Sequence, residues 1–395
     1  MWASGEVGAS GGSILTKMNA GFRWHSEARL FDGAGREYAA QDAGDGVIAE
    51  RPSGLAVARA LAAGAFRIGG EGPAPVGGFE TLTSGSSGVP RRIGRDFASW
   101  TGSFHVNSRL FGIGPGMRVA VLGRMTQSLA LYGALEGMHL GAQVHLLDDL
   151  RPDRQAAALG GVDLVYATPA QMRMVVEAGR GWPGLRHLVI GGAKLDGALR
   201  AAVLAAAPGV RIAEFYGAAE ASFITMAGAD CPPDSVGRAY PGVEIRVEGG
   251  EVWVKSPYLF AGYAGDPGPA RWDAGWLSVG EMGEMREGFL YLKGRAGRMV
   301  TVADQNVFPE EIEAFLQGLQ GVAQVAVVPE ADALRGVRLV AVVRGDRLRD
   351  AKIVAAMRAQ FGTLKAPKRL IWLQDWPVLP SGKTDLRAIA VEVAR

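Results

Sequence analysis

The chain has 395 residues, of which 48% are hydrophobic, and this composition can fill the cores of roughly two to three globular domains. Lys and Arg number 42 against 40 Asp and Glu, so the net charge gives no reason to expect a nucleic-acid partner or an anionic membrane. We therefore expect the partner to be a small molecule.

The cysteine and histidine content limits which cellular compartment and which kinds of metal site can be expected. Cys231 is the single cysteine of the sequence, and the five histidines are scattered without ligand-like spacing. An intrachain disulfide and a multi-cysteine metal site are therefore excluded. The opening stretch MWASGEVGASGGSILTK lacks a basic start before an apolar core, and no later stretch has the apolar length of a spanning helix. We expect a cytoplasmic protein without a membrane span.

Strands and helices alternate from Arg118 onward. Upstream of that point, GLAVARALAAGAF predicts a helix leading into a strand. RVAVLG is the first clear strand, and a helix rich in small residues begins near Ser128. QVHLL and DLVYAT are further strands, and Thr168 with Pro169 forms a cap and first turn for the helix PAQMRMVVEAG. This alternation predicts an α/β domain with a largely parallel, doubly wound sheet.

The same alternation of strands and helices continues to about Ser235, after which the sequence changes to short runs with the alternating pattern of β-strands. RHLVIGG and VRIAEFYG predict two more strands, separated by an alanine-rich helix from about Leu195 to Ala207. EIRVEGGEVWVKS then shows two alternating runs joined by Gly249 and Gly250. That arrangement predicts a β-hairpin within a smaller, β-rich subdomain.

A third region begins near Arg298. FPEEIEAFLQGLQG places Pro309 and an acidic first turn before an apolar-periodic helix. VAQVAVV and RLVAVV read as strands, and DAKIVAAMRAQF reads as a helix. These segments predict a compact α+β domain at the C-terminal end.

The stretch TSGSSGVPRR combines hydroxyls, glycines and arginines without an acidic residue. Backbone amides and hydroxyls that converge in such a loop can cradle phosphate oxygens, and an arginine can add a bidentate contact. The candidate phosphate-binding residues are Thr83, Ser84, Gly85, Ser86, Ser87, Gly88 and Arg91. A Gly/Ser linker is an equally good interpretation of this stretch alone, whereas a Walker-type loop fits poorly because no Gly-Lys-Ser/Thr follows the last glycine.

Five segments in order resemble motifs of the adenylate-forming superfamily, which includes acyl-CoA synthetases, luciferases and nonribosomal adenylation domains. TSGSSGVPRR is similar to the phosphate loop, and EFYGAAEAS to the Tyr-Gly-x-Thr-Glu segment. GWLSVGEMGEM is similar to the Gly-Trp and Thr-Gly-Asp segment, GRAGRMVTVADQNVFPEEIE to the hinge, and PSGK to the C-terminal lysine motif. The resemblance covers about Val76 to the C-terminus.

The resemblance implies two domains. Residues 1–296 would form an AMP-binding N-terminal domain that is abbreviated at its start, and residues 297–395 would form a small, mobile domain that swivels about Gly297. The implied reaction joins a carboxylate to the α-phosphate of ATP and then passes the acyl group to a thiol, with coenzyme A or a phosphopantetheine carrier as the acceptor. By the same resemblance, the acid would be an acyl or aryl acid.

Each site residue has a role by this resemblance and a plainer alternative. Lys383 would be the catalytic cation between carboxylate and α-phosphate, and alternatively a solvated lysine. Glu220 would bind Mg²⁺, and alternatively start a helix. Arg295 and Glu281 would meet the ribose hydroxyls, where each is otherwise an ordinary surface charge. Tyr216 would lie against adenine, or else pack in the core. The nucleotide floor would comprise Gly191, Gly192, Ala193, Lys194, Glu214, Phe215, Tyr216 and Gly217.

Three positions depart from the family pattern. Ala219 stands in place of a threonine and removes a hydroxyl near the phosphates, and Glu281 replaces an aspartate and is longer by one methylene. Asp304 stands where a glycine usually lets the pantetheine arm pass, so a carboxylate adds bulk and charge there.

Three interpretations follow from these features. The first is an ATP-dependent acid:CoA ligase, and the second is an adenylating enzyme that serves an acyl carrier protein. The third is a relative that binds a nucleotide or acyl ligand without turnover. The segment RMTQS lacks the histidine or aromatic residue that commonly gates the acyl pocket, so fatty, aryl and small branched acids are all retained. His105 and His139 are expected to pack or to lie at the surface.

Overall fold

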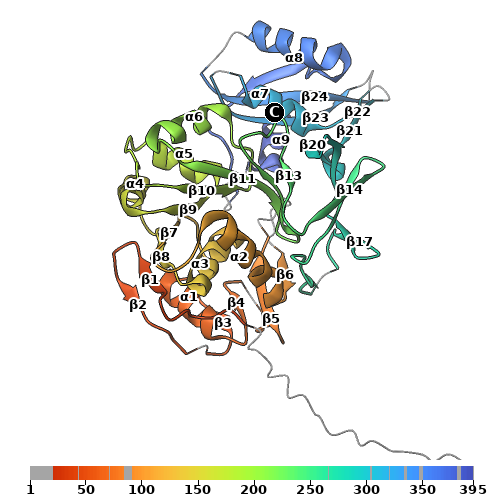
Figure 1. Cartoon of the computed structure of the whole chain (residues 1–395). Helices are drawn as coiled ribbons and strands as arrows, with labels where there is room; N and C mark the ends of the chain where they lie inside the picture. The colour runs from red at the N-terminus through yellow and green to blue at the C-terminus, as the bar shows by residue number, and fades with distance from the viewer. Residues whose placement is uncertain are drawn as a thin grey trace, which may run out of the picture.

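A computed structural model of the chain describes residues 21–42, 44–70, 72–83, 91–265, 267–302, 305–319, 321–332, 336–346, 350–379 and 384–394. Its centre is a nine-stranded sheet in the order β13-β12-β11-β10-β9-β7-β8-β1-β2 (Figure 1). The six strands from β11 to β1 run parallel, and β2, β12 and β13 are antiparallel to their neighbours. The strands are β1 (Arg29–Asp32), β2 (Glu37–Tyr38), β7 (Arg118–Val121), β8 (Gln143–Leu146), β9 (Leu164–Ala167), β10 (His187–Gly191), β11 (Arg211–Ala218), β12 (Ser222–Ala227) and β13 (Arg238–Ala239).

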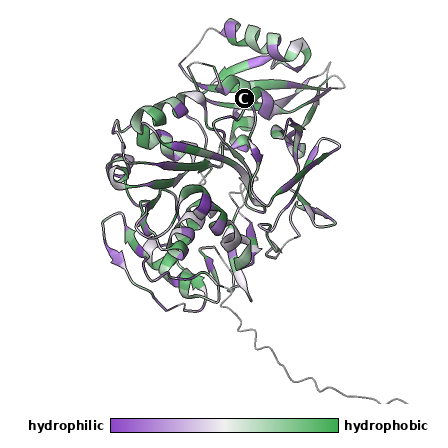
Figure 2. Ribbon diagram, in the orientation of Figure 1, coloured by the Kyte–Doolittle hydropathy of each residue, from purple (hydrophilic) through white to green (hydrophobic). Residues whose placement is uncertain are grey.

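Helices cover both faces of this sheet, which confirms the predicted doubly wound domain. Val119 and Val121 join the core beneath α2 and α3, while Ala120 and Leu122 join a second core beneath α4, α5 and α6. Successive side chains of a strand point to opposite faces, so one apolar run fills both cores, and the strands are mostly apolar in Figure 2. The helices are α2 (Phe97–Phe111), α3 (Ser128–Leu140), α4 (Pro152–Ala158) continued by the 3₁₀ turn η1 (Leu159–Gly161), α5 (Pro169–Val176) and α6 (Gly197–Ala206).

The start of α5 agrees with the predicted cap at Thr168, and α6 has a cap that the sequence analysis did not name. The Thr168 hydroxyl accepts from the Gln171 amide, and the Gln171 side chain accepts from the Thr168 amide, which completes a capping box at α5. The Asp196 side chain accepts from the Leu199 amide at 2.9 Å and caps α6. None of the helices in the described residues is long and apolar enough to cross a membrane.

A separate five-stranded sheet, in the order β16-β6-β5-β4-β3, lies beside the central one. The sequence predicted its β4 and the preceding helix α1 (Ser53–Ala62), but not the sheet as a whole, nor the place of β1 and β2 in the central sheet. Most of these strands are too short to show an alternating pattern, and β16 comes from far along the chain. The strands are β3 (Val47–Ile48), β4 (Ala65–Ile68), β5 (Gly78–Leu82), β6 (Arg92–Arg95) and β16 (Gly262–Tyr263).

The predicted hairpin is confirmed within a six-stranded antiparallel sheet. Val247 pairs with Val252 across Gly249 and Gly250, whose φ values of 58° and 84° suit the tight hairpin turn. The sheet order is β17-β18-β15-β19-β20, with β14 paired to β15. The strands are β14 (Glu244–Glu248), β15 (Glu251–Lys255), β17 (Arg271–Asp273), β18 (Trp276–Ser278), β19 (Glu281–Arg286) and β20 (Phe289–Arg295).

The C-terminal part has its own two-sided core around a three-stranded sheet, β23-β24-β25. Val327 and Ala341 pack with α7 and α8, while Ala326 and Val342 pack with α9. In Figure 1 this part lies above the large sheets, and α7 contacts β20. The elements are η2 (Ala296–Arg298), β21 (Val300–Val302), β22 (Gln305–Val307), α7 (Pro309–Gln317), β23 (Val322–Asp332), β24 (Gly336–Gly345), α8 (Asp350–Lys365), β25 (Arg369–Trp372) and α9 (Leu386–Ala394).

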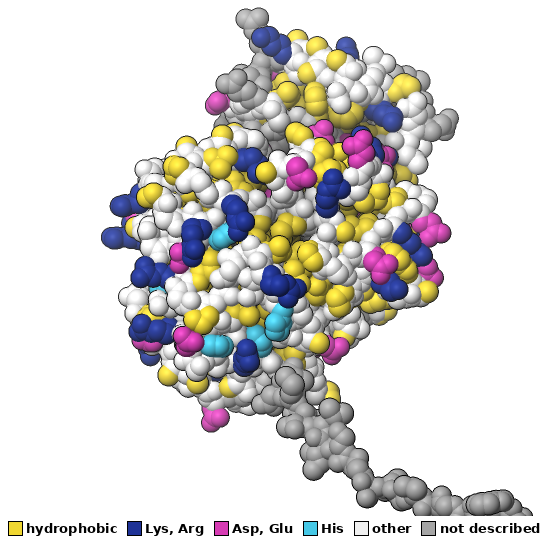
Figure 3. All heavy atoms as spheres, in the orientation of Figure 1, with side chains coloured by type: hydrophobic (Ala, Val, Ile, Leu, Met, Phe, Trp, Pro, Cys, Tyr) yellow, Lys and Arg dark blue, Asp and Glu magenta, His cyan; other side chains and the backbone are white. Residues whose placement is uncertain are grey.

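Charged side chains are mixed on the visible surface. In Figure 3, Lys and Arg are spread over the large domain and interspersed with Asp and Glu, without one continuous basic patch on that face. This distribution agrees with the small net charge and with the expectation of a small-molecule partner.

Candidate functional site

The candidate nucleotide floor lies where β10 and β11 end, at the carboxyl edge of the parallel sheet. In open α/β sheets, ligands bind outside this edge. A side chain at Gly191 would approach the Phe215 ring to 2.5 Å, and Phe215 in turn packs edge-on against Phe223 with centroids 4.6 Å apart. Glycine at 191 is therefore required by packing, which lets Phe215 lie close to the end of β10.

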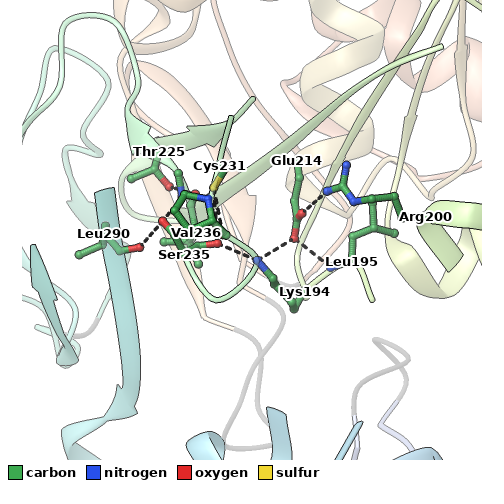
Figure 4. Close-up of polar contacts among 11 residues, drawn as sticks. Lys194, Leu195, Arg200, Glu214, Thr225, Cys231, Ser235, Val236 and Leu290 are labelled. Atoms are coloured by element: carbon green, nitrogen blue, oxygen red, sulfur yellow. Dashed lines mark hydrogen bonds and ion pairs between the residues drawn. The ribbon is translucent and has the colours of Figure 1, made fainter. Parts of the chain in front are cut away.

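The Glu214 carboxylate connects several segments of the candidate nucleotide floor by hydrogen bonds (Figure 4). It is buried and accepts from the Leu195 amide and the Arg200 guanidinium, each at 2.9 Å. Lys194 Nζ lies 3.8 Å from the same carboxylate and donates to the Ser235 carbonyl at 2.7 Å. Both oxygens of Glu214 are thus engaged by the protein, so this side chain shapes the floor and leaves ligand contacts to its neighbours.

A β-bulge interrupts the pairing of β11 with β12 between Tyr216 and Gly217, near the end of the strand. A side chain at Gly217 would meet the Ser222 carbonyl oxygen at 2.1 Å, and Ser222 itself has a φ of 58°. Bulges of this kind re-aim a side chain near the end of a strand. Burial raises the pKa of Tyr216 well above its ordinary value, and the charge of Glu281 adds to the shift. Tyr216 therefore presents a neutral phenol at the site.

Glu220 lies in the tight turn between β11 and β12 and is held from two directions. The Phe260 amide donates to its carbonyl, and the Tyr263 hydroxyl donates to its Oε1, both at 2.8 Å. Burial and the charge of Glu220 raise the pKa of Tyr263, which keeps that hydroxyl a donor, while the charge of Arg91 acts in the opposite direction. Tyr263 also pairs with Ile93 on β6, two residues after Arg91, so the turn lies close to the base of the candidate phosphate loop.

The donor set at Glu220 suits Mg²⁺ better than a metal held by protein alone. Within the described residues there is no group of three or more His, Cys, Asp or Glu side chains that could hold a metal. Mg²⁺ usually keeps several waters and binds one or two carboxylates together with substrate phosphates. A single carboxylate with one oxygen fixed by Tyr263 fits that mode of binding.

Glu281 and Arg295 face each other as a register pair across β19 and β20. Arg295 Nε donates to Glu281 Oε1 at 2.9 Å. Burial acts to lower the pKa of Arg295, but the charge and hydrogen bond of Glu281 outweigh burial and the pKa is raised. The charge of Glu220 acts in the same direction on this guanidinium. The structure therefore brings the two candidate ribose residues together on neighbouring strands.

The candidate phosphate loop has a defined base. The Thr83 amide donates to the Arg91 carbonyl at 2.8 Å, and the Arg91 amide donates to Thr83 Oγ1 at 2.9 Å. These bonds extend the antiparallel pairing of β5 and β6 beyond Leu82 and Arg92. The remaining predicted residues of the loop, and two further sequence candidates, lie outside the described residues: Ser84, Gly85, Ser86, Ser87, Gly88, Asp304 and Lys383.

Sequence reasoning missed Arg95, which directly follows the candidate loop on β6. The strand Arg92–Arg95 alternates in burial, and Arg95 falls on the buried side with Ile93. That alternation was the available signal, because an arginine in phase with a buried isoleucine needs internal partners. Its guanidinium donates to the carbonyl of Ala219, the residue before Glu220.

Comparison with known proteins identifies the family of the chain. The sequence model of the AMP-binding enzyme family matches residues 81–264, and that of the AMP-binding enzyme C-terminal domain matches residues 311–383. The chain belongs to the adenylate-forming superfamily. This adenylate-forming protein is 32% identical over 321 residues to the uncharacterized acyl-CoA ligase YhfT of Bacillus subtilis, an alignment that covers 76% of this chain and 66% of YhfT.

Solved structures agree on the fold. The amide bond synthetase McbA of Marinactinospora thermotolerans matches with a TM-score of 0.71 at 26% identity, over 80% of this chain and 68% of McbA. The o-succinylbenzoate CoA synthetase MenE of Bacillus subtilis matches with a TM-score of 0.68 at 21% identity, over 78% of this chain and 67% of MenE. This adenylate-forming protein thus spans about two thirds of the length of these relatives.

Proposed function

We propose that this protein uses ATP to activate an acyl or aryl carboxylic acid as an acyl adenylate, and then transfers the acyl group to coenzyme A. The observation that carries the proposal is the Glu220 turn. Its one carboxylate accepts from the Tyr263 hydroxyl at 2.8 Å. Tyr263 pairs with Ile93 on the strand that follows the candidate phosphate loop, and Tyr216 lies on β11 just before the turn. A phosphate loop, a metal-binding carboxylate and an aromatic floor are the parts of a site that binds a nucleoside triphosphate.

In the first half-reaction, a carboxylate oxygen of the acid bonds to the α-phosphorus of ATP. The bond from that phosphorus to the oxygen bridging to the β-phosphate breaks, and pyrophosphate leaves with the electron pair. Mg²⁺ held at Glu220 would neutralise phosphate charge. Lys383 would stabilise the charge that develops between the two anions, and Tyr216 and the 191–194 loop would orient the base.

In the second half-reaction, the thiol sulfur bonds to the acyl carbon, the thiol proton passes to solvent, and AMP leaves. A second candidate acceptor is an amine, and two observations favour it. McbA, a structural match at TM-score 0.71, is an amide bond synthetase, and by the family resemblance Asp304 stands at a motif position where a glycine usually lets the pantetheine arm pass. A carrier-protein phosphopantetheine is the third acceptor.

The test is acid-dependent exchange of pyrophosphate into ATP across a panel of aliphatic and aromatic acids, with Lys383→Ala as the control. We expect exchange with at least one acid class and its loss in the variant. Exchange that persisted in Lys383→Ala would contradict the assigned mechanism. Offering coenzyme A, a carrier protein and small amines to the acid that gives exchange then identifies the acceptor by its product.

A further inference from the structure

Arg95 is a buried arginine that connects three segments at the back of the Glu220 turn. Its side chain is almost fully buried, at 2% exposure for the residue. One terminal nitrogen donates to the Tyr258 carbonyl at 3.0 Å and to Ser99 Oγ at 3.3 Å, and the other donates to the Ala219 carbonyl. The Trp100 ring centroid lies 5.7 Å from the guanidinium carbon.

Burying Arg95 at this position costs folding free energy. A buried guanidinium loses its hydration and is normally compensated by a hydrogen-bonded carboxylate, but the partners of Arg95 are two carbonyls and a hydroxyl. Its Nε is buried without a partner among the described residues. Burial lowers the pKa of Arg95 to about 10, and the negative charge of Glu220 opposes that shift. Arg95 therefore remains a cation at neutral pH, and Glu220 supplies part of its compensation.

The bonds of Arg95 fix the backbone that carries Glu220. The carbonyl of residue 219 is held by Arg95, and the carbonyl of residue 220 is held by the Phe260 amide at 2.8 Å. The Tyr258 carbonyl, which also binds Arg95, accepts from Ser222 Oγ at 3.2 Å on the far side of the turn. Arg95 thus joins the strand that returns from the phosphate loop to both ends of the turn.

We propose that Arg95 is a positioning residue for the metal carboxylate. It fixes the Ala219–Glu220 peptide relative to the base of the phosphate loop, so that the Glu220 side chain and the phosphates share one Mg²⁺. This inference rests on the proposed function of the site. Removing a group that orients a metal ligand by hydrogen bonds typically lowers metal affinity or activity by about 10- to 100-fold.

A matched control is available in the same five-stranded sheet. Arg67 on β4 is equally buried, at 3% exposure, and its guanidinium also donates to backbone carbonyls, those of Gly69 at 2.7 Å and Pro73 at 3.0 Å. These carbonyls belong to the segment after β4 and have no bond to the Glu220 turn. Arg67→Met therefore reports what loss of a buried arginine costs the fold alone.

The experiment titrates Mg²⁺ at fixed ATP in the pyrophosphate-exchange assay for Arg95→Met, Arg95→Lys and Arg67→Met. We expect Arg95→Met to raise the Mg²⁺ concentration at half-maximal rate about 10- to 100-fold with little change in the KM for the acid. Arg95→Lys should shift the Mg²⁺ dependence less than Arg95→Met, because lysine keeps the positive charge but lacks the planar guanidinium that donates to several acceptors at once. Arg67→Met should lower the melting temperature without shifting the Mg²⁺ dependence.

Two outcomes would overturn the inference. One is a folded Arg95→Met or Arg95→Lys protein with the Mg²⁺ dependence of the wild type, and the other is an equal shift in Arg67→Met. Mn²⁺ binding to the wild type and variants in the presence of a nonhydrolysable ATP analogue separates this inference from the proposed function. If no acid supports exchange, the proposed function fails, while weaker Mn²⁺ binding in the Arg95 variants still supports the positioning role.

Discussion

Two glutamates in the large domain show how differently the same side chain is used. Glu136 on α3 is fully buried and accepts from Asn107 Nδ2 at 2.9 Å, from the Tyr132 hydroxyl at 3.2 Å and from the Tyr166 hydroxyl. Glu220 is partly exposed, and the Tyr263 hydroxyl holds its Oε1. The first carboxyl is surrounded by donors from the protein, whereas the second retains capacity for a ligand.

The network around Glu136 continues through the core. The Tyr240 hydroxyl donates to Asn107 Oδ1 at 2.7 Å, and Ser103 Oγ lies 2.7 Å from the Tyr132 hydroxyl. Burial raises the pKa of Glu136 to about 8, although its three donors act to lower it. Glu136 is therefore mainly a neutral acid at pH 7. The comparison teaches that a carboxyl enclosed by protein donors serves packing between α2 and α3, whereas a carboxyl that is only partly engaged by the protein is the one available for the chemistry proposed at Glu220.

The largest expected effect concerns the cation that would act with the open carboxylate. Lys383→Ala should lower the rate of adenylate formation by about 100- to 1,000-fold, because one preorganised charge in the transition state is lost. Pyrophosphate exchange measures this rate. Lys352→Ala, an exposed lysine on α8, is the matched control, and an equal loss in that variant would contradict a specific role for Lys383.

The paired substitution Glu220→Gln and Glu136→Gln tests the comparison directly. We expect Glu220→Gln to lower Mg²⁺-dependent exchange by about 10- to 100-fold, because the amide cannot supply an anionic ligand. Its melting temperature should change little. Glu136→Gln should keep its exchange rate, since the wild-type carboxyl is already neutral. A Glu136→Gln variant as inactive as Glu220→Gln would break the distinction.

Tyr263→Phe sharpens the description of the open carboxylate. Loss of the hydroxyl frees Glu220 Oε1, and a hydrogen bond to a charged group is typically worth roughly tenfold in an equilibrium. We expect the Mg²⁺ concentration at half-maximal exchange rate to rise roughly tenfold. The control is Tyr258→Phe, whose hydroxyl bonds the Pro241 carbonyl at 2.9 Å. A Mg²⁺ dependence unchanged in Tyr263→Phe would show that this bond does not orient Glu220.

The last prediction concerns stability at Glu136 and has no expected effect on activity at neutral pH. The folded state holds the Glu136 proton up to a pKa of about 8, whereas the unfolded chain releases it near 4.5. The folded state therefore binds more protons between these values, and stability from this group falls as pH rises from about 4.5 to about 8. Denaturant unfolding of wild type and Glu136→Gln should show the wild type losing stability relative to the variant across that range. Parallel pH profiles would refute the raised pKa.

Local sequence features predicted the elements whose partners are near in the chain. The strand and helix alternation after Arg118, the Thr168 cap and the hairpin at Gly249 and Gly250 depend on short-range periodicity and turn geometry. The fifth strand of the five-stranded sheet is added by the pairing of Gly94 with Gly262, which no local pattern contains. Arg95 was missed for the same reason, because its partners at Ala219 and Tyr258 lie far along the chain.

The sequence by itself determined which family this protein belongs to, and it predicted which segments would supply a phosphate loop, a metal carboxylate and a hinge, because these are contiguous motifs with local chemistry. The tertiary structure decided which acidic side chains remain available to a ligand. Glu136, Glu214 and Glu220 are three glutamates in similarly apolar surroundings in the sequence. Burial and donors from distant elements engage the first two, and only folding can bring those donors together.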